Sequence, residues 1–327
     1  MHLKAAIGMG LLSLFTMADP TTARADDPAP KGVAGILAAH DRALIRELEE
    51  YLKKNPKADD RDEAYSAIYD RVIDHDWFAE TEPVAKAYLA EHPEGAARPM
   101  ARIVATMARV RAGKFIEALG VYQELMKGLD RADQEEFAVS FADNLAAAAT
   151  TAGEFGVARK VFQILGDRFP DRPELKAKVD NDLARLDRVG KTAPRIAAAD
   201  VFGKEIKTAD LKSKYVLVDF WATFAAPCLA ELPNLKAAYA KYHARGFEVL
   251  AVSMDEKADD LLAFARDRKL PWRILHNRSA GQDLSDLFGV ANIPASFLIG
   301  PDGKIIRLDL KGPALDKALG GLLDAGK

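Results

Sequence analysis

Hydrophobic positions along the first half of the chain follow the period of an α-helix. Leu37, Leu44, Leu48 and Leu52 recur at intervals of seven and four, which places them on one face of a helix. Glycine and proline divide the chain that follows, up to about residue 190, into further segments of helical pattern. These segments lie at about 61–78, 82–91, 97–112, 114–128, 131–151, 154–168 and 173–189. The chain before residue 190 is therefore predicted to be helical.

Two of these segments share one sequence pattern, at a constant offset of 40 residues. A glycine turn, an aromatic residue and then a small residue allow the helices of neighbouring hairpins to approach closely. The pattern resembles tetratricopeptide repeats, whose usual spacing is shorter, at about 34 residues. The stretch from Val84 to His92 is a candidate third copy, and an irregular bundle with two coincidentally similar helices is the alternative. The matching residues are Gly113, Phe115, Ala118, Tyr122, Gln123 and Leu125 with Gly153, Phe155, Ala158, Phe162, Gln163 and Leu165.

From about Thr192 the pattern changes to short apolar runs. Residues 215–221 and 247–253 are rich in valine and aromatic residues, which predicts two buried strands with a helix between them. That order implies a parallel crossover, and a hairpin around residues 301–303 adds antiparallel strands. Further helices are predicted at about 257–269, 283–288 and 313–323, and a further strand at 272–276. We therefore expect an α/β domain, a mixed sheet with helices on both faces.

The first 25 residues have the pattern of a signal peptide. Lys4 precedes an apolar run from Ala5 to Ala18, and Ala23-Arg24-Ala25 fits the small-x-small cleavage pattern. The run is shorter than the roughly 20 apolar residues that span a bilayer. We expect cleavage near Ala25, a periplasmic or secreted protein without a transmembrane segment in the mature chain, and two domains, 26–190 and 191–327.

The amino-acid composition limits the classes of binding partner and cofactor that we expect. The formal net charge is −3 and no basic cluster is present, which argues against nucleic acid and acidic membrane surfaces as partners. The six histidines show no metal-ligand spacing, so we expect no metal and no cofactor. The single cysteine, Cys228, excludes a disulfide within the chain.

The chemically most informative stretch runs from Val216 to Cys228 and reads VLVDFWATFAAPC. With Glu231 and Pro233 behind it, it resembles the active-site region of the thioredoxin superfamily, and within that the TlpA/ResA-like exported branch. Residues 290–303 are similar to the cis-proline loop and closing hairpin of the same family. The resemblance covers about residues 195–327 and implies a thioredoxin fold there.

The main departure from the family is Ala225, which stands where relatives have the first cysteine of a C-x-x-C pair. A cysteine at a helix N-terminus has a lowered pKa and attacks as a thiolate. Cys228 corresponds to the second, resolving cysteine. The resemblance implies that Asp219 accepts protons and that Glu231 tunes the cysteines. Each residue also has an alternative interpretation. Asp219 faces a solvated cleft or a lysine, Glu231 is an ordinary exposed helix residue, and Cys228 is a small buried side chain that serves only packing.

Pro294 is the remaining family landmark. If the Ile293–Pro294 bond is cis, as in relatives, the preceding backbone can pair with an extended peptide, beside Trp221, Phe224 and Ala225. Two functions follow as hypotheses. The first is a module that binds a protein or peptide partner in the cell envelope without dithiol turnover. The second is a monothiol redox enzyme that uses Cys228 with Asp219 and Glu231. An engineered Ala225 is a third possibility.

Overall fold

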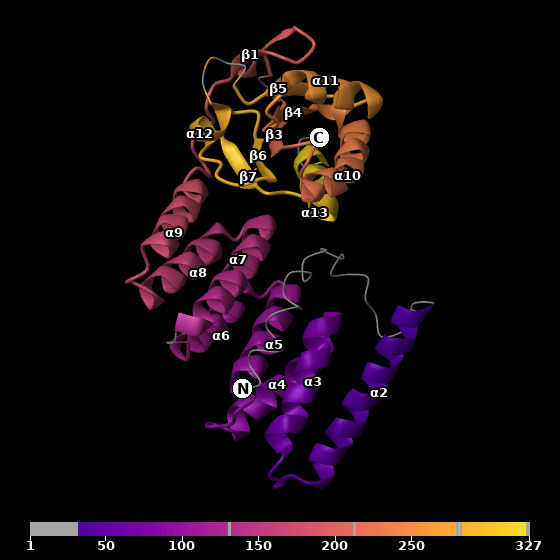
Figure 1. The fold of residues 1–327 in the computed structure, drawn as a ribbon, viewed down its shortest axis with the longest axis vertical. Helices are drawn as coiled ribbons and strands as arrows, with labels where there is room; N and C mark the ends of the chain where they lie inside the picture. The colour runs from indigo at the N-terminus through magenta and orange to yellow at the C-terminus, as the bar shows by residue number, and fades with distance from the viewer. Residues whose placement is uncertain (1–31, 130–131, 212–213, 279–280, 282, 325–327) are drawn as a thin grey trace. The chain divides into compact units, whose positions relative to one another are not determined.

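The computed structural model describes residues 32–129, 132–211, 214–278, 281 and 283–324. The chain forms two compact units (Figure 1), one made of residues up to 149 together with 156–175, the other of residues 150–155 and 176–327. The predicted signal peptide, residues 1–25, lies outside the described residues. Within the described part, no helix is long and apolar enough to cross a membrane.

The described part of the chain before residue 190 is helical, as predicted. Consecutive helices pack against each other, for example α4 against α5 and α5 against α6. Short turns at Gly113 and Gly153 separate helices, and both glycines have a positive φ, of 71° and 86°. The helices are α2 (Val33–Lys54), α3 (Arg61–His75), α4 (Phe78–Glu91), α5 (Arg98–Arg111), α6 (Phe115–Lys127), α7 (Glu135–Ala152), α8 (Phe155–Arg168) and α9 (Pro173–Leu186).

Three helix hairpins repeat, where the sequence indicated two. The second helix of each begins with phenylalanine, at Phe78, Phe115 and Phe155. The residue two positions earlier is left-handed each time, and in the first hairpin it is Asp76, with φ of 58°. Aspartate tolerates this conformation better than most residues do. Equivalent inward positions are buried in all three copies: Thr81, Ala118 and Ala158, then Ala85, Tyr122 and Phe162, then Tyr88, Leu125 and Leu165.

A five-stranded mixed sheet forms the centre of the second unit, in the order β5-β4-β3-β6-β7. The central strand, β3 (Tyr215–Trp221), is parallel to β4 (Phe247–Ser253) and antiparallel to β6 (Ala295–Ile299). β5 (Arg273–His276) and β7 (Ile305–Leu308) form the edges. A small separate pair, β1 (Ala197–Ala199) and β2 (Glu205–Lys207), precedes the sheet. The predicted α/β mixed sheet is confirmed.

Helices cover both faces of this sheet. Leu217 and Trp221 of β3 belong to a buried cluster with residues of α10 (Ala226–Tyr242), α11 (Ala258–Asp267) and α13 (Gly312–Asp324). On the other face, Phe220 lies against Phe288 of α12 (Leu284–Phe288) and Phe297 of β6. Because side chains alternate along a strand, Asp219 shares its face with Leu217 and Trp221.

The segment between the two predicted domains is an ordered part of the second unit. The amide of Gly190 donates to Ile305 (2.8 Å), Ile305 donates to Lys191 (3.0 Å), and Ala193 donates to Gly303 (2.9 Å). The segment therefore pairs with the outer edge of β7 like a short extra strand. The continuous part of the second unit, from Lys176 onward, also includes most of α9.

Candidate functional site

The site lies where β3 ends and α10 begins. Ala225 is the N-cap of α10, and its methyl group makes no hydrogen bond to the helix end. Cys228 follows one turn later, and its amide donates to the carbonyl of Ala225 (2.9 Å). A side chain at the position of Ala225 faces the free N–H groups of the helix, where a thiolate would be stabilised. Alanine leaves that position without a reactive group.

Cys228 is buried, with 4% of its surface exposed. Burial raises the pKa of the Cys228 thiol; a hydrogen bond with the Ala222 backbone partly opposes the rise, and the nearby Asp219 carboxylate adds a smaller rise. A raised pKa reduces the thiolate fraction at neutral pH, and the thiolate is the nucleophilic form. The thiol of Cys228 is therefore buried and less readily ionised than an ordinary cysteine.

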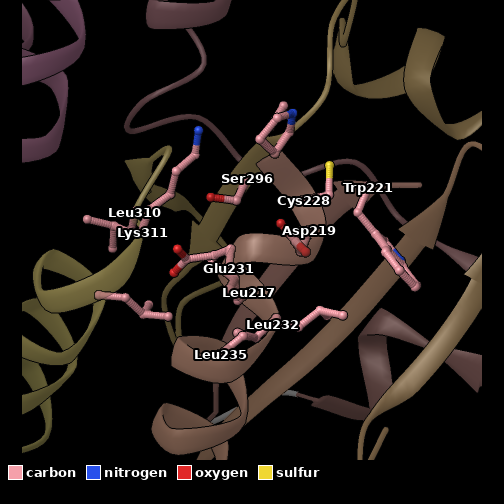
Figure 2. Close-up of a pocket in the computed structure, with 13 residues that line it drawn as sticks. Leu217, Asp219, Trp221, Cys228, Glu231, Leu232, Leu235, Ser296, Leu310 and Lys311 are labelled. Carbon is pink, nitrogen blue, oxygen red and sulfur yellow. The ribbon is translucent and has the colours of Figure 1, made fainter. Parts of the chain in front are cut away.

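Cys228 lines a small pocket that also contains two carboxyl groups (Figure 2). Asp219 lies beneath the first turn of α10, between Cys228 and Glu231. Burial raises the pKa of Asp219 to about 7; the charges of Glu231 and Asp309 add to the rise, and Lys311 opposes it. The pocket is lined by Leu217, Asp219, Trp221, Cys228, Glu231, Leu232, Leu235, Pro294, Ala295, Ser296, Leu310, Lys311 and Leu315.

Glu231 is held in place by the first residue of α13, which follows Lys311. Its Oε1 accepts a short hydrogen bond from the amide of Gly312, and its Oε2 accepts one from Asn234 Nδ2 (3.2 Å). Glu231 therefore connects α10 to the loop that carries the exposed Lys311. Two carboxyl groups and one lysine meet at this pocket, an arrangement that can hold or move a proton next to the thiol.

The Ile293–Pro294 peptide bond is cis, as the sequence predicted. Pro294 and Ser296 line the pocket on the side of β6. Ser296 is 3% exposed, and its hydroxyl has no hydrogen-bond partner among the described residues. The cis-proline loop thus forms one wall of the pocket, opposite Cys228 on α10.

The structure brings most of the predicted site residues together. Trp221 is 2% exposed, packs against Phe264 and forms a buried wall of the pocket. Ala225 and Ile293 are partly buried and pack against the same core. Phe224 does not line the pocket; it is 73% exposed at the tip of the loop before α10.

One buried carboxylate beside the site escaped the sequence analysis. Asp255, 7% exposed, accepts hydrogen bonds from the amide of Thr223 (3.1 and 3.2 Å) and from the hydroxyl of Ser253 (2.6 Å). The Thr223 hydroxyl also donates to it. Asp255 thereby fixes the loop that presents Phe224. The signal was available, because the carboxyl ends of β3 and β4, two parallel neighbours, lie at the same edge of the sheet.

Among the described residues, no group of three or more histidine, cysteine, aspartate or glutamate side chains is placed to hold a metal ion. The pocket brings together a thiol, two carboxyl groups and the partly exposed cis-proline loop.

Comparison with known proteins places this site in a family. The AhpC/TSA family model matches residues 189–308. The thiol-disulfide oxidoreductases ResA of Bacillus thuringiensis (strain Al Hakam) and Bacillus anthracis are each 35% identical over 120 residues, which cover 37% of this chain and 68% of each relative. The chain belongs to the ResA-like thiol-disulfide oxidoreductase family. Within this family it has only one cysteine, so it cannot form the intrachain dithiol pair.

Two solved structures are similar in sequence to part of this chain. The thioredoxin domain of a thiol-disulfide oxidoreductase from Bacteroides vulgatus is 29% identical, with a TM-score of 0.39, over 41% of this chain and 97% of that one. A thiol:disulfide interchange protein from a Bacteroides species is 29% identical, with a TM-score of 0.38, over 41% of this chain and 88% of that one.

Proposed function

We propose that this ResA-like protein binds an extended peptide or protein segment at its cis-proline loop and performs no dithiol–disulfide turnover. The observation that carries the proposal is the start of α10, where alanine occupies the position of the attacking thiol and the remaining thiol is buried. Turnover needs an accessible thiolate, whereas binding needs only shape and free backbone groups. Alanine in place of the attacking cysteine therefore prevents dithiol–disulfide turnover but leaves the peptide-binding surface intact.

The binding surface that we propose has two parts. The backbone beside cis-Pro294 offers hydrogen bonds to an extended chain, as a strand edge does. Phe224 adds an exposed aromatic side chain, held by the Asp255 contacts to the adjacent Thr223. Fixed aromatic residues lose little entropy on binding and are frequent anchors at interfaces.

We extend the proposal to the helical unit and to the location of the protein. The three hairpins beginning at Arg61, Arg98 and Glu135 support a tetratricopeptide-like array, which commonly binds peptides on its concave side. Export through the predicted signal peptide would place the partner in the cell envelope. Amino-terminal sequencing of the protein recovered from the envelope tests this, because cleavage near Ala25 is expected and an intact Met1 contradicts export.

Binding is tested with a reduced, carboxymethylated unfolded protein as the probe, which offers extended chain and no free thiol. Fluorescence anisotropy should show that Phe224→Ala weakens binding by about tenfold or more, the loss typical of an aromatic anchor. Phe202→Ala is the matched control, because Phe202 is also exposed, at 51%, and lies in the turn between β1 and β2. Equal affinities for both variants, or no binding by the wild type, would refute the proposal.

The alternative, a monothiol enzyme, is tested by alkylating Cys228 with iodoacetamide between pH 5 and 10. We expect slow labelling of the native protein, because the thiol is buried and its pKa is raised, and fast labelling after denaturation. Fast native labelling with an apparent pKa below the ordinary value of about 8.5 would instead establish a reactive thiol.

A further inference from the structure

Helix α9 precedes the thioredoxin-like sheet, yet two arginines at its end reach the cis-proline loop. The segment that contains cis-Pro294 runs from Gly289, after α12, to Ser296 in β6. Arg188 contacts the first end of this segment and Arg185 contacts the second end. All of these residues belong to the second unit.

Arg185 acts on the second end through Asp309. Its guanidinium forms a very short ion pair with Asp309 Oδ1 and lies over the ring of Phe297, 5.4 Å from the centroid. The same Oδ1 accepts the amide of Ser296 (3.2 Å), and the amide of Asp309 donates to the carbonyl of Ser296 (2.9 Å). A side-chain carboxylate thus supplies the acceptor for the backbone N–H of Ser296, two residues after the cis-proline.

Arg188 contacts the first end of the segment. Its Nη1 donates to the carbonyl of Leu287 in the last turn of α12 (3.2 Å). Its guanidinium also lies directly against Gly289, where an added Cβ would be 3.0 Å from Nη2. Gly289 has a φ of 65°, a conformation that favours glycine, and its lack of a side chain leaves room for the guanidinium.

The end of α9 is itself fixed. Directly after it, Gly190 and Lys191 exchange backbone hydrogen bonds with Ile305 of β7. The two arginines therefore extend from a base that is hydrogen-bonded to the sheet and contact both ends of one loop.

We propose that Arg185 and Arg188 are positioning residues that hold the cis-proline loop in its binding conformation, which makes α9 part of the peptide site. This inference rests on the proposed peptide-binding function. Its structural half, that the arginines hold the loop, can be measured without any peptide.

The test uses the full-length protein and two readouts, amide hydrogen exchange at Ser296 by NMR and binding of the carboxymethylated unfolded probe. Arg185→Ala should speed exchange at Ser296 and weaken binding, each by about tenfold, the effect of losing one charge-assisted hydrogen bond that supports a loop. Lys176→Ala is the matched control, since Lys176 lies on the same helix, is 69% exposed and pairs within that helix with Asp180 (2.7 Å). Alanine favours the helix, so neither variant should disturb α9.

Two further variants separate positioning from general stability. Arg185→Lys keeps the charge and should recover part of the protection of Ser296. In an Asp309→Asn background, which removes the charge that Arg185 pairs with, Arg185→Ala should add little to either readout. Arg188→Ala should weaken binding of the probe in the same way as Arg185→Ala, from the other end of the loop.

The inference is overturned if Arg185→Ala leaves exchange at Ser296 unchanged. It is also overturned if exchange at Ser296 becomes faster in Arg185→Ala while this variant binds the probe as tightly as the wild type. A wild-type protein that does not bind the probe refutes the proposed function instead. In that case the exchange at Ser296 alone decides whether the arginines hold the loop.

Discussion

Replacing Asp219 by asparagine measures the cost of keeping a carboxyl group in the pocket. Burial and the neighbouring carboxylates raise the pKa of Asp219 from 3.8 to about 7 in the folded protein. Below pH 4 this group is protonated in both the folded and the unfolded chain. Between pH 4 and 7 the unfolded chain has lost the proton and the folded chain retains it, so the free energy of unfolding falls as the pH rises.

The structure sets the size of this effect. Each tenfold change in proton affinity is worth about 1.4 kcal/mol, so the rise to about 7 lowers the stability of the second unit by at most about 4 kcal/mol above pH 7. Asp219→Asn has nearly the same shape and no charge. It should leave stability almost unchanged at pH 4 and raise it by up to about 4 kcal/mol at pH 8.

Urea unfolding followed by tryptophan fluorescence at pH values from 4 to 8.5 measures this. Trp221 and Trp272 lie in the second unit, and a Trp77→Phe background removes the tryptophan of the helical unit. Asp267→Asn is the control, because the side chain of Asp267 is 80% exposed. Parallel stability profiles for the wild type and Asp219→Asn across this range would show that Asp219 ionises freely, and the account of the pocket would be wrong.

Two further substitutions test the start of α10 and the helix hairpins. Ala225→Cys places a thiol at the N-terminus of α10, one turn before Cys228. This variant should reduce insulin disulfides measurably, whereas we expect no reduction by the wild type. An inactive variant with an intact fold would show that more than the missing thiol prevents turnover. Ala118→Leu overfills a fully buried contact in the second hairpin and should lower the stability of the helical unit by about 1–3 kcal/mol in urea unfolding followed by circular dichroism. Ala79→Leu, at an exposed position of α4, should change it little, and equal losses would contradict the repeat packing.

The sequence predicted the elements whose signals are local. The strand 215–221 is a continuous apolar run because both faces of the central strand are covered, with Leu217 on one side and Phe220 on the other. The resemblance of the motifs around Cys228 and Pro294 to the thioredoxin superfamily implied the cis bond that the structure has. Asp219 stood out because a carboxylate inside such a run has no ordinary packing reason.

Two kinds of feature were not predicted from the sequence. One is contacts between residues far apart in the chain, and the other is a repeat in which a substitution changes the expected pattern. Arg185 and Asp309 are separated by 124 positions, and nothing local in either stretch indicates that they pair. The first helix hairpin was obscured because Asp76 takes the left-handed position that Gly113 and Gly153 take in the other two.

The backbone pairing of residues 190–193 with the β7 edge has a practical consequence for truncated forms of this protein. A fragment that starts at residue 191, where the change of sequence pattern invites a cut, loses α9 and the hydrogen bond from Gly190 that begins the pairing with β7. Its β7 edge then has free backbone groups, and such edges recruit strands from other molecules. A fragment that starts ahead of α9 keeps the edge covered. We therefore expect a fragment that includes α9 to be the more soluble of the two.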